Sequence, residues 1–496
     1  MPVQATNLME AYTLATRNDS DWAAKKAKYL ADREIVDQAL AGLLPTINLN
    51  AQYGEQTFEG PNFDFIEDCT SLGIFSVIAC LNNPPDGTSK QQSTHENYNL
   101  RITQPIYRRD RWYKYDASKS IEKSHQAELA YAQQELILKV SEGYFGVLRA
   151  QEELKISITE QKSLHTQLDE VKKRYKLGLS RDTDLFEVQA SYDIAKAGRI
   201  TAEGALEDIK EDLKLLTGQA DIVVAPLPSD IPITPPKPAL SKDWVDFANQ
   251  NNYQVLAARF AVDSAKKQQK EKSSGYHPTL DFAIEHAKRI GNGGVSGDTE
   301  TSIYGIQLTV PIFSGGIKAS QARQAKHQHT EAKHKLEFAR KNATRETRQF
   351  YNRVLTDIST LKAKGHAVRS HNSAHRSIKD GYESGLRTLT DVLTAEKKVY
   401  AARKEYTTAR YDYILDSLRL KKSSGILTPK DIETLNGWLD GKVQNANMAN
   451  DKDPLSLDNI DNIKITSERI IPLPEDEDKK PAHDTLFDAY KAWKEE

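Results

Sequence analysis

Apolar and polar residues alternate in short runs of the chain, strictly so at residues 46–53, and such alternation predicts β-strands with one apolar and one polar face. The runs are residues 46–55, 97–107, 278–288 and 302–313. In the first, Ile47, Leu49, Ala51 and Tyr53 occupy every second position. Arg101 falls on the polar side of the second run, which therefore faces water because burying an unpaired charge is costly.

Long proline-free stretches rich in Ala, Glu, Gln, Lys and Leu follow each pair of strands and predict helices. No proline occurs between Pro105 and Pro226, or between Pro311 and Pro429. Up to Gly178 the first stretch gives a helix of roughly 65–70 residues, ~100 Å long at 1.5 Å per residue. A return helix is expected from about Asp182 to Leu216. Helices this long need neighbours along their length, as in coiled-coil packing.

Two related segments mark the ends of these helices, RYKLGLSRDTDLFEVQASY at 174–192 and GYESGLRTLTDVLTAEKKVY at 381–400. Four matched pairs share an offset of 207 positions: Tyr175 with Tyr382, Gly178 with Gly385, Leu179 with Leu386, and Asp184 with Asp391. The chain is therefore an internal duplication. Each segment is expected to form the tip of a helical hairpin, with Gly in the C-cap and Leu as its apolar anchor. Ser180 or Thr388 would cap the return helix.

The duplication predicts two repeats joined by a linker. Residues 1–225 form the first repeat, with its tip near 175–184, and 242–440 form the second, with its tip near 382–391. Each repeat opens with a helical segment, at about 6–43 and 244–273. Residues 226–241 are a proline-rich linker. Residues 451–496 hold 13 acidic and 7 basic residues, a net charge of −6, and 441–496 are expected to be a disordered tail.

Composition excludes several classes of protein. A net charge of −2 gives no case for a nucleic-acid partner. The sequence has no run of 18 or more apolar residues, so it predicts no transmembrane helix. It also has no apolar signal-peptide core after Met1, so we expect either a cytoplasmic protein or a mature sequence whose signal peptide has been removed. Cys69 and Cys80 lie close together in one long loop. They are either a disulfide formed in an oxidising compartment or two free thiols.

The sequence shows no motif of a catalytic, metal-binding or cofactor-binding site. His371 and His375 are four residues apart on a predicted helix, without the Glu that follows the first His in zinc proteases. His327, His329 and His334 lie on a charged helix and are expected to be solvated. The sequence contains no phosphate-binding loop, no Gly-x-Ser-x-Gly and no Cys-x-x-Cys. We therefore expect a protein that is not an enzyme.

Four amphipathic strands are too few for a closed barrel, since even small barrels need about eight. A trimer would supply twelve strands with a polar lumen and an apolar exterior. Strands of ~10 residues are long enough to cross a bilayer at a tilt. The alternative is a soluble protein in which a small sheet packs on helices.

Several motifs together resemble the TolC family of bacterial outer-membrane efflux and type I secretion channels, over roughly residues 6–440. They are Leu43-Leu44-Pro45 before the first strand, Thr103-Gln104-Pro105-Ile106 after the second, Pro278-Thr279-Leu280-Asp281, Val310-Pro311-Ile312-Phe313-Ser314-Gly315-Gly316, and the two Gly-Leu tips. The resemblance implies a mixed α and β fold: a homotrimer whose twelve-stranded barrel, four strands per chain, crosses the outer membrane and continues into a periplasmic α-helical tunnel.

The resemblance also implies roles for the tips. Gly178, Leu179, Gly385 and Leu386 match the positions that dock a periplasmic adaptor protein. The family closes its tunnel by links between helices, and the positions of those links match Thr183, Asp184, Tyr382 and Arg387. Its acidic selectivity ring matches Asp391. The second aspartate of that ring is Thr394 here, which implies weaker block by multivalent cations. The chain would be a passive exit duct, surrounded by outer-membrane lipid and opened by the adaptor and an inner-membrane transporter of RND or ABC type.

Two other readings compete with the exit duct. A soluble helical coiled-coil scaffold needs no membrane, and it would be extracted without detergent. A periplasmic adaptor is disfavoured, because the duplication provides two strand pairs and no lipoyl-like module. Without the resemblance, Asp184 and Asp391 are simply acids near helix N-termini, worth about 0.3–1 kcal/mol each.

Overall fold

The computed structural model describes residues 6–61, 88–219, 222–228, 231–292 and 298–439. Cys69, Cys80 and the tail 441–496 lie outside the described residues. The described chain divides into two compact units. The strand unit comprises Glu34–Ser120 and Asp263–Thr330, and the helical unit comprises the described parts of Met1–Arg33, Ile121–Val262 and Glu331–Glu496.

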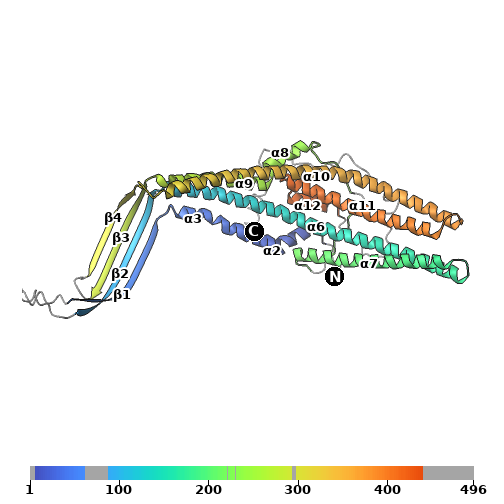
Figure 1. The fold of residues 1–496 in the computed structure, drawn as a ribbon, viewed down its shortest axis with the longest axis horizontal. Coiled ribbons are helices and arrows are strands. Elements are labelled where there is room, and N and C mark those ends of the chain that lie inside the picture. Colours follow the sequence, from blue (N-terminus) through green and yellow to red (C-terminus); the bar gives the residue numbers. More distant parts are fainter. Residues whose placement is uncertain (1–5, 62–87, 220–221, 229–230, 293–297, 440–496) are drawn as a thin grey trace, which may run out of the picture. The chain divides into compact units, whose positions relative to one another are not determined.

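The strand unit contains one antiparallel sheet in the order β1-β2-β3-β4 (Figure 1). Its strands are β1 (Thr46–Pro61), β2 (Thr88–Tyr107), β3 (Thr279–Asn292) and β4 (Thr299–Thr309). One register row joins Ile47, Ile102, Ile284 and Tyr304 across all four strands. On the other face Asn99 Nδ2 donates to Glu285 Oε1 at 2.8 Å. The predicted division into an apolar and a polar face is confirmed.

The strand bounds differ from those that alternation predicts. β1 continues to Pro61 and β2 begins at Thr88, because the backbone ladder between them persists after the alternation has faded, for example at Gly54 opposite His95. β4 ends at Thr309 rather than at 313. Pro311 has no N–H to continue a ladder, and Gly315 with φ 59° turns the chain. Ile312 is consequently left 95% exposed.

A charged pair fixes the base of the sheet within the strand unit. Arg108 follows β2 and binds Asp281 of β3 with two hydrogen bonds, Nε to Oδ1 at 2.9 Å and Nη2 to Oδ2 at 2.5 Å. Asp281 is 8% exposed, and its hydrogen bond raises the pKa of Arg108. Nearby, Arg111 Nη1 donates to the carbonyl of Gly42 at 2.6 Å, directly after α3 (Ile35–Ala41).

The helical unit is built on four long helices that lie in the order α7, α6, α11, α10 (Figure 1). α6 (Arg109–Lys176) has 68 residues and α10 (Ile317–Glu383) has 67; their return helices are α7 (Asp182–Thr217) and α11 (Leu389–Ser423). Glycine allows α6 and α7 to approach closely, because a Cβ on Gly146 would lie 3.1 Å from Ile209. Both long hairpins agree with the prediction, and α6 has the length expected for it.

The shorter helices correct two predictions of continuous helices. The segment expected at 6–43 is three helices, α1 (Leu8–Asn18), α2 (Ser20–Arg33) and α3. The helix expected at 244–273 is divided into α8 (Ser241–Asn251) and α9 (Tyr253–Ser273), and a 3₁₀ turn (Ser274–Tyr276) follows them. Two of the three breaks fall at Asp19 and Asn252, whose side chains cap the following helix; the third falls at Glu34, whose side chain makes no cap. α12 (Pro429–Asn436) was not predicted.

Aromatic residues hold the core of the helical unit. Tyr144 and Phe145 of α6 and Tyr411 of α11 are fully or almost fully buried. The rings of Tyr144 and Phe145 meet edge to face with centroids 5.9 Å apart. The Tyr144 hydroxyl accepts the N–H of Ala225 at 2.9 Å and donates to the carbonyl of Thr6 at 3.1 Å. One buried hydroxyl thus ties the start of the linker and the N-terminal segment to α6.

Within the described ranges, none of the helices combines the length and the apolar character that a membrane-spanning helix requires.

Candidate gate at the hairpin tips

The two tips share one backbone geometry. Gly178 has φ 71° and Gly385 has φ 76°. In the first tip the N–H of Gly178 donates to the carbonyl of Tyr175 (2.9 Å), and that of Leu179 to Arg174 (2.8 Å); Gly385 and Leu386 repeat both bonds at 3.0 and 2.8 Å. This is the helix C-cap that needs a residue in the left-handed region. Glycine is required here by conformation, since nothing lies within 4 Å of either Cβ position.

The leucines that follow these glycines do not anchor the tips, contrary to the sequence prediction. Leu179 is 66% exposed, Leu386 is 83% exposed and Leu177 is 73% exposed. The backbone bonds alone close each tip, so the leucine side chains remain available. Exposed leucines on a tight, rigid turn form a small apolar surface suited to contact with another protein.

The return helices begin with different caps. Thr388 and Asp391 form a capping box: the Thr388 N–H donates to Asp391 Oδ2 at 3.1 Å and the Asp391 N–H donates to Thr388 Oγ1 at 3.2 Å. The backbone bond from Thr388 lowers the pKa of Asp391. Ser180 does not cap α7, which starts one residue later than a Ser180 cap requires. Its hydroxyl instead donates to Asp184 Oδ2 at 3.1 Å.

The proposed gate residues occupy the two tips without joining each other inside this chain. Asp184 accepts the Arg181 N–H at 3.3 Å, and Thr183 is exposed at the start of α7. Tyr382 packs beside a buried cluster at the base of the tips, and the Arg174 guanidinium lies 5.9 Å from its ring centroid. Arg387 is exposed, and its backbone N–H donates to the carbonyl of Gly381 at 3.2 Å.

Other contacts, which the sequence did not suggest, hold the tip regions together. Leu164, Leu168 and Val171 of α6 share an apolar cluster with residues of α7 and α11: Val188, Ala195, Leu389 and Leu393. Beside it Thr390 Oγ1 donates to Glu187 Oε2 at 2.5 Å, which links α11 to α7. Thr390 and Glu187 are 203 positions apart and lie on exposed surfaces, so no local pattern marks them as partners.

Behind the tips, α6 and α11 face each other with opposite charges along an antiparallel ladder. At four rungs a glutamate of α6 meets a basic residue of α11, and at the rung nearest the tip an amide of α6 meets a glutamate of α11. From the tip backward the rungs are Gln167–Glu396, Glu160–Lys404 (3.7 Å), Glu152–Arg410 (2.7 Å), Glu142–Arg419 (2.6 Å) and Glu135–Lys422 (3.5 Å). Arg410 is 3% exposed. We call this set the α6–α11 ladder.

The two rungs nearest the tip together hold two acids, Glu396 and Glu160, and one base, Lys404. Glu396 is 4% exposed and accepts a hydrogen bond from Gln167. Burial raises the pKa of Glu160, although Lys404 opposes the shift. This end of the ladder is therefore electrostatically weaker than the Glu152–Arg410 and Glu142–Arg419 rungs behind it.

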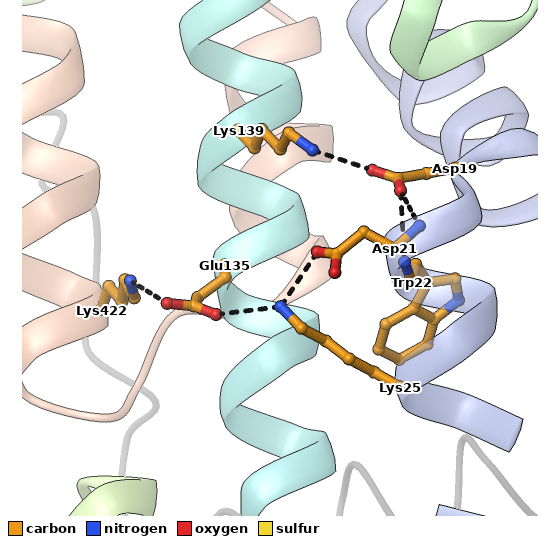
Figure 2. Close-up of polar contacts among 7 residues, drawn as sticks. All are labelled: Asp19, Asp21, Trp22, Lys25, Glu135, Lys139 and Lys422. Atoms are coloured by element: carbon orange, nitrogen blue, oxygen red, sulfur yellow. Dashed lines mark hydrogen bonds and ion pairs between the residues drawn. The ribbon is translucent and has the colours of Figure 1, made fainter. Parts of the chain in front are cut away.

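The far end of the ladder joins a second polar network, shown in Figure 2. Lys25 of α2 lies between Asp21 (3.0 Å) and Glu135 (3.4 Å), and Glu135 also meets Lys422. Lys139 pairs with Asp19 at 3.3 Å. Burial opposes ionisation of Asp19, but the N–H donors of Trp22 and Asp21 together with Lys139 lower its pKa. The network fastens the N-terminal helices to α6 and α11.

Comparison with known proteins gives this geometry a context. A profile of the outer membrane efflux protein family matches residues 11–219 and 244–426. The outer membrane protein TolC of Vibrio cholerae serotype O1 is 32% identical over 447 residues, 88% of this chain and 94% of that protein. The alkaline protease secretion protein AprF of Pseudomonas aeruginosa is 26% identical over 437 residues, 86% of each chain.

Solved structures show the same fold. The outer membrane protein VceC of Vibrio cholerae superposes with a TM-score of 0.67 at 17% identity, covering 84% of this chain and 96% of that one. The open state of the MtrE channel of Neisseria gonorrhoeae gives 0.65 at 17% identity, covering 85% and 90%. Sequence and fold together define an outer-membrane channel protein. The chain belongs to the outer membrane efflux protein family, and it is an exit duct of the kind that serves efflux and type I secretion.

Proposed function

We propose that three copies of the chain close one twelve-stranded barrel and one helical tunnel, and that the tunnel is a passive conduit gated at the tips. The sheet is the observation that supports a trimer. It has four strands, and within the described chain the edge strands β1 and β4 each pair with only one other strand. A sheet of four amphipathic strands with two open edges needs further strands to close, and eight is about the minimum. Three identical chains satisfy this by rotational symmetry.

Solution mass in detergent tests the trimer. The particle should contain three chains of 55.7 kDa after subtraction of bound detergent by multi-angle light scattering. It should also require detergent to leave the membrane fraction. A monomer that stays soluble in plain buffer would support the helical scaffold instead.

At the tips, we propose that Thr183 and Asp184 of one hairpin are linked to Tyr382 and Arg387 of another in the closed assembly, with the Asp391 carboxylates forming an acidic ring. Arg387 is exposed. Its charge helps to lower the pKa of Asp391, but among the described residues no carboxylate forms a salt bridge with it, so its guanidinium is able to bind Asp184 of a neighbouring copy. A charge-assisted bond of this kind is strong enough to hold a closed state, yet it yields to a partner that binds the open state more tightly.

Replacement of Tyr382 with Phe and Arg387 with Ser tests the gate. The double variant should raise single-channel conductance severalfold in planar bilayers, because both links lose their donor. Tyr175 occupies the position of Tyr382 in the first repeat, so Tyr175→Phe is the matched control and should leave conductance unchanged. Equal conductance in all three proteins would place the gate elsewhere.

We also propose that Gly178, Leu179, Gly385 and Leu386 dock a periplasmic adaptor, and that an inner-membrane transporter supplies the energy. The exposed leucines support this, as they give each tip an apolar contact surface. Leu179→Asp with Leu386→Asp should abolish export in cells while the purified channel keeps its wild-type conductance. Normal export by that variant would mean that the adaptor binds elsewhere.

A further inference from the structure

One face of α10 carries a line of exposed cations. Lys333, Arg340, Arg348, Lys362 and Arg376 are all exposed. They follow each other at 7, 8, 14 and 14 residues, spacings close to whole helical turns, so the five side chains lie on the same face. Within the described part of the chain none of the five has an acidic partner. We call this set the cationic stripe.

The stripe belongs to a basic stretch that the duplication does not explain. Residues 331–383 hold 12 Lys/Arg and 6 Asp/Glu, whereas the matching segment of the first repeat, 124–176, holds 8 of each. From 358 to 379 there are five Lys/Arg and no acid. Like charges in a row repel each other, and a surface of this kind attracts a polyanion.

The chain supplies an anionic segment that starts at the same level along α10 as the stripe, on the side of the helix that faces α11. α12 borders the same small cavity as Tyr413 and Lys421 of α11. Lys364 of α10 lies against Glu405 of α11, with Nζ 3.4 Å from the backbone oxygen. Because the two helices are antiparallel with equal rise, Lys421, sixteen residues after Glu405, is level with Arg348, sixteen residues before Lys364. The described chain therefore ends, at Leu439, at the axial level of the middle of the stripe, and the segment beyond it has to pass around the helix to reach the stripe.

Beyond Leu439 the sequence turns acidic. Residues 451–496 carry a net charge of −6, and Glu475-Asp476-Glu477-Asp478 are four consecutive acids. Glu475 follows Leu439 by 36 residues, and flexible linkers of that length in general have a root-mean-square span of roughly 30–36 Å. The distance along α10 from Arg348 to Lys362 is about 21 Å. The acids can therefore reach most of the stripe.

We propose that the acidic segment at 475–478 binds the cationic stripe of α10 and acts as its intramolecular counter-charge. A single exposed ion pair contributes only about 0–1 kcal/mol. Tethering favours binding, because a segment linked to its site by a flexible chain acts at an effective concentration of ~mM. Several weak ion pairs are then enough to hold the segment on the stripe. The tail thus screens the stripe from other anionic surfaces.

Zero-length carbodiimide cross-linking of the full-length protein in detergent, followed by peptide mapping, tests the proposal. Lys333 and Lys362 should form isopeptide bonds with the acids at 475–478. The yield should be at least several times that of Lys398, an exposed lysine of α11 without an acidic partner among the described residues. Raising the salt from ~0.05 M to ~0.5 M should reduce the yield severalfold, because exposed charges are screened.

Two variants sharpen the test. The first variant combines Arg340→Gln, Arg348→Gln and Arg376→Gln. It should lower cross-linking at Lys362 severalfold, because the positive electrostatic potential of the stripe is reduced. Arg345→Gln with Arg353→Gln removes two exposed cations on other faces of the same helix and should have no such effect. Cross-links from Lys362 to acids of α7 in another copy would overturn the proposal and assign the stripe to a subunit interface. Yields equal to that of Lys398 would also overturn it.

Discussion

At the scale of single residues, glycine conformation and buried charge govern the behaviour of the helical unit. Gly178 and Gly385 adopt positive φ with no neighbour near their Cβ positions, so their identity is set by the backbone alone. Gly204 is helical and equally uncrowded, but its φ is ordinary. We therefore expect substitution by alanine to lower the free energy of unfolding at the tip glycines and to raise it at Gly204.

Gly385→Ala should therefore lower the free energy of unfolding by about 1 kcal/mol, because an L residue at positive φ is strained. Gly204→Ala is the control, and it should raise stability by about 0.5–1 kcal/mol through helix propensity. Thermal unfolding of the purified protein in detergent measures both. Destabilisation by both substitutions would contradict this assignment of the tip.

Asp357 of α10 makes stability depend on pH. Burial, followed by the negative charges of Asp416 and Asp412, raises its pKa to about 6. Because the folded state holds the proton more tightly than the unfolded state, the free energy of unfolding should fall as the pH rises from about 4 to about 6. The loss should be about 1 kcal/mol, since this half-exposed site is partly screened by solvent.

Asp357→Asn should remove this part of the pH dependence and make the protein more stable than the wild type at pH 8. Asp380→Asn, on the exposed end of the same helix, is the matched control and should leave the pH profile unchanged. The measurement is the free energy of unfolding at several pH values. A wild-type pH slope in Asp357→Asn would refute the assignment of this pH dependence to Asp357.

At the scale of elements, the α6–α11 ladder determines how the two hairpins sit against each other. Its strongest rung joins Arg410, 3% exposed, to Glu152, with Tyr411 donating to the same carboxylate oxygen at 2.8 Å. Removal of one partner from such a pair leaves a charge buried and uncompensated. The rung closest to the tips carries less complementary charge, so separation of the hairpins is expected to start there.

Glu152→Gln should thus lower the free energy of unfolding by about 3 kcal/mol, because Arg410 remains buried without its counter-charge. Glu207→Gln in α7 removes an exposed pair with Lys210 and should change stability by less than ~0.5 kcal/mol. Chemical denaturation in detergent compares the two. A similar small effect in both would show that water reaches Arg410.

The elements that the sequence predicted are those with local signals. Alternation located the four strands, proline-free runs located the long helices, and the repeated Gly-Leu segments located the tips. The ladder and the Thr390–Glu187 contact were not predicted, because their partners are more than 200 positions apart and one charged residue on a helix surface resembles another. Leu179 and Leu386 were assigned as anchors because the motif alone does not show that backbone bonds suffice to close the turn.

At the scale of the whole molecule, the placement of the sheet in the outer membrane depends on its apolar face. In one chain Leu49 is 69% exposed, and Ile306 and Leu308 are 64% and 63% exposed. Apolar side chains on one face and a polar network around Glu285 on the other suit a wall between lipid and water. Family membership and the matched folds agree with a channel, whereas closure at the tips is our proposal for the assembled protein.

Single-channel recording of the wild-type protein, purified in detergent and added to a planar lipid bilayer, tests the central claim most directly. A trimeric channel narrowed at acidic tips should insert and give small, stable, cation-selective openings. Failure to insert, together with a soluble monomer in detergent-free buffer, would contradict the account.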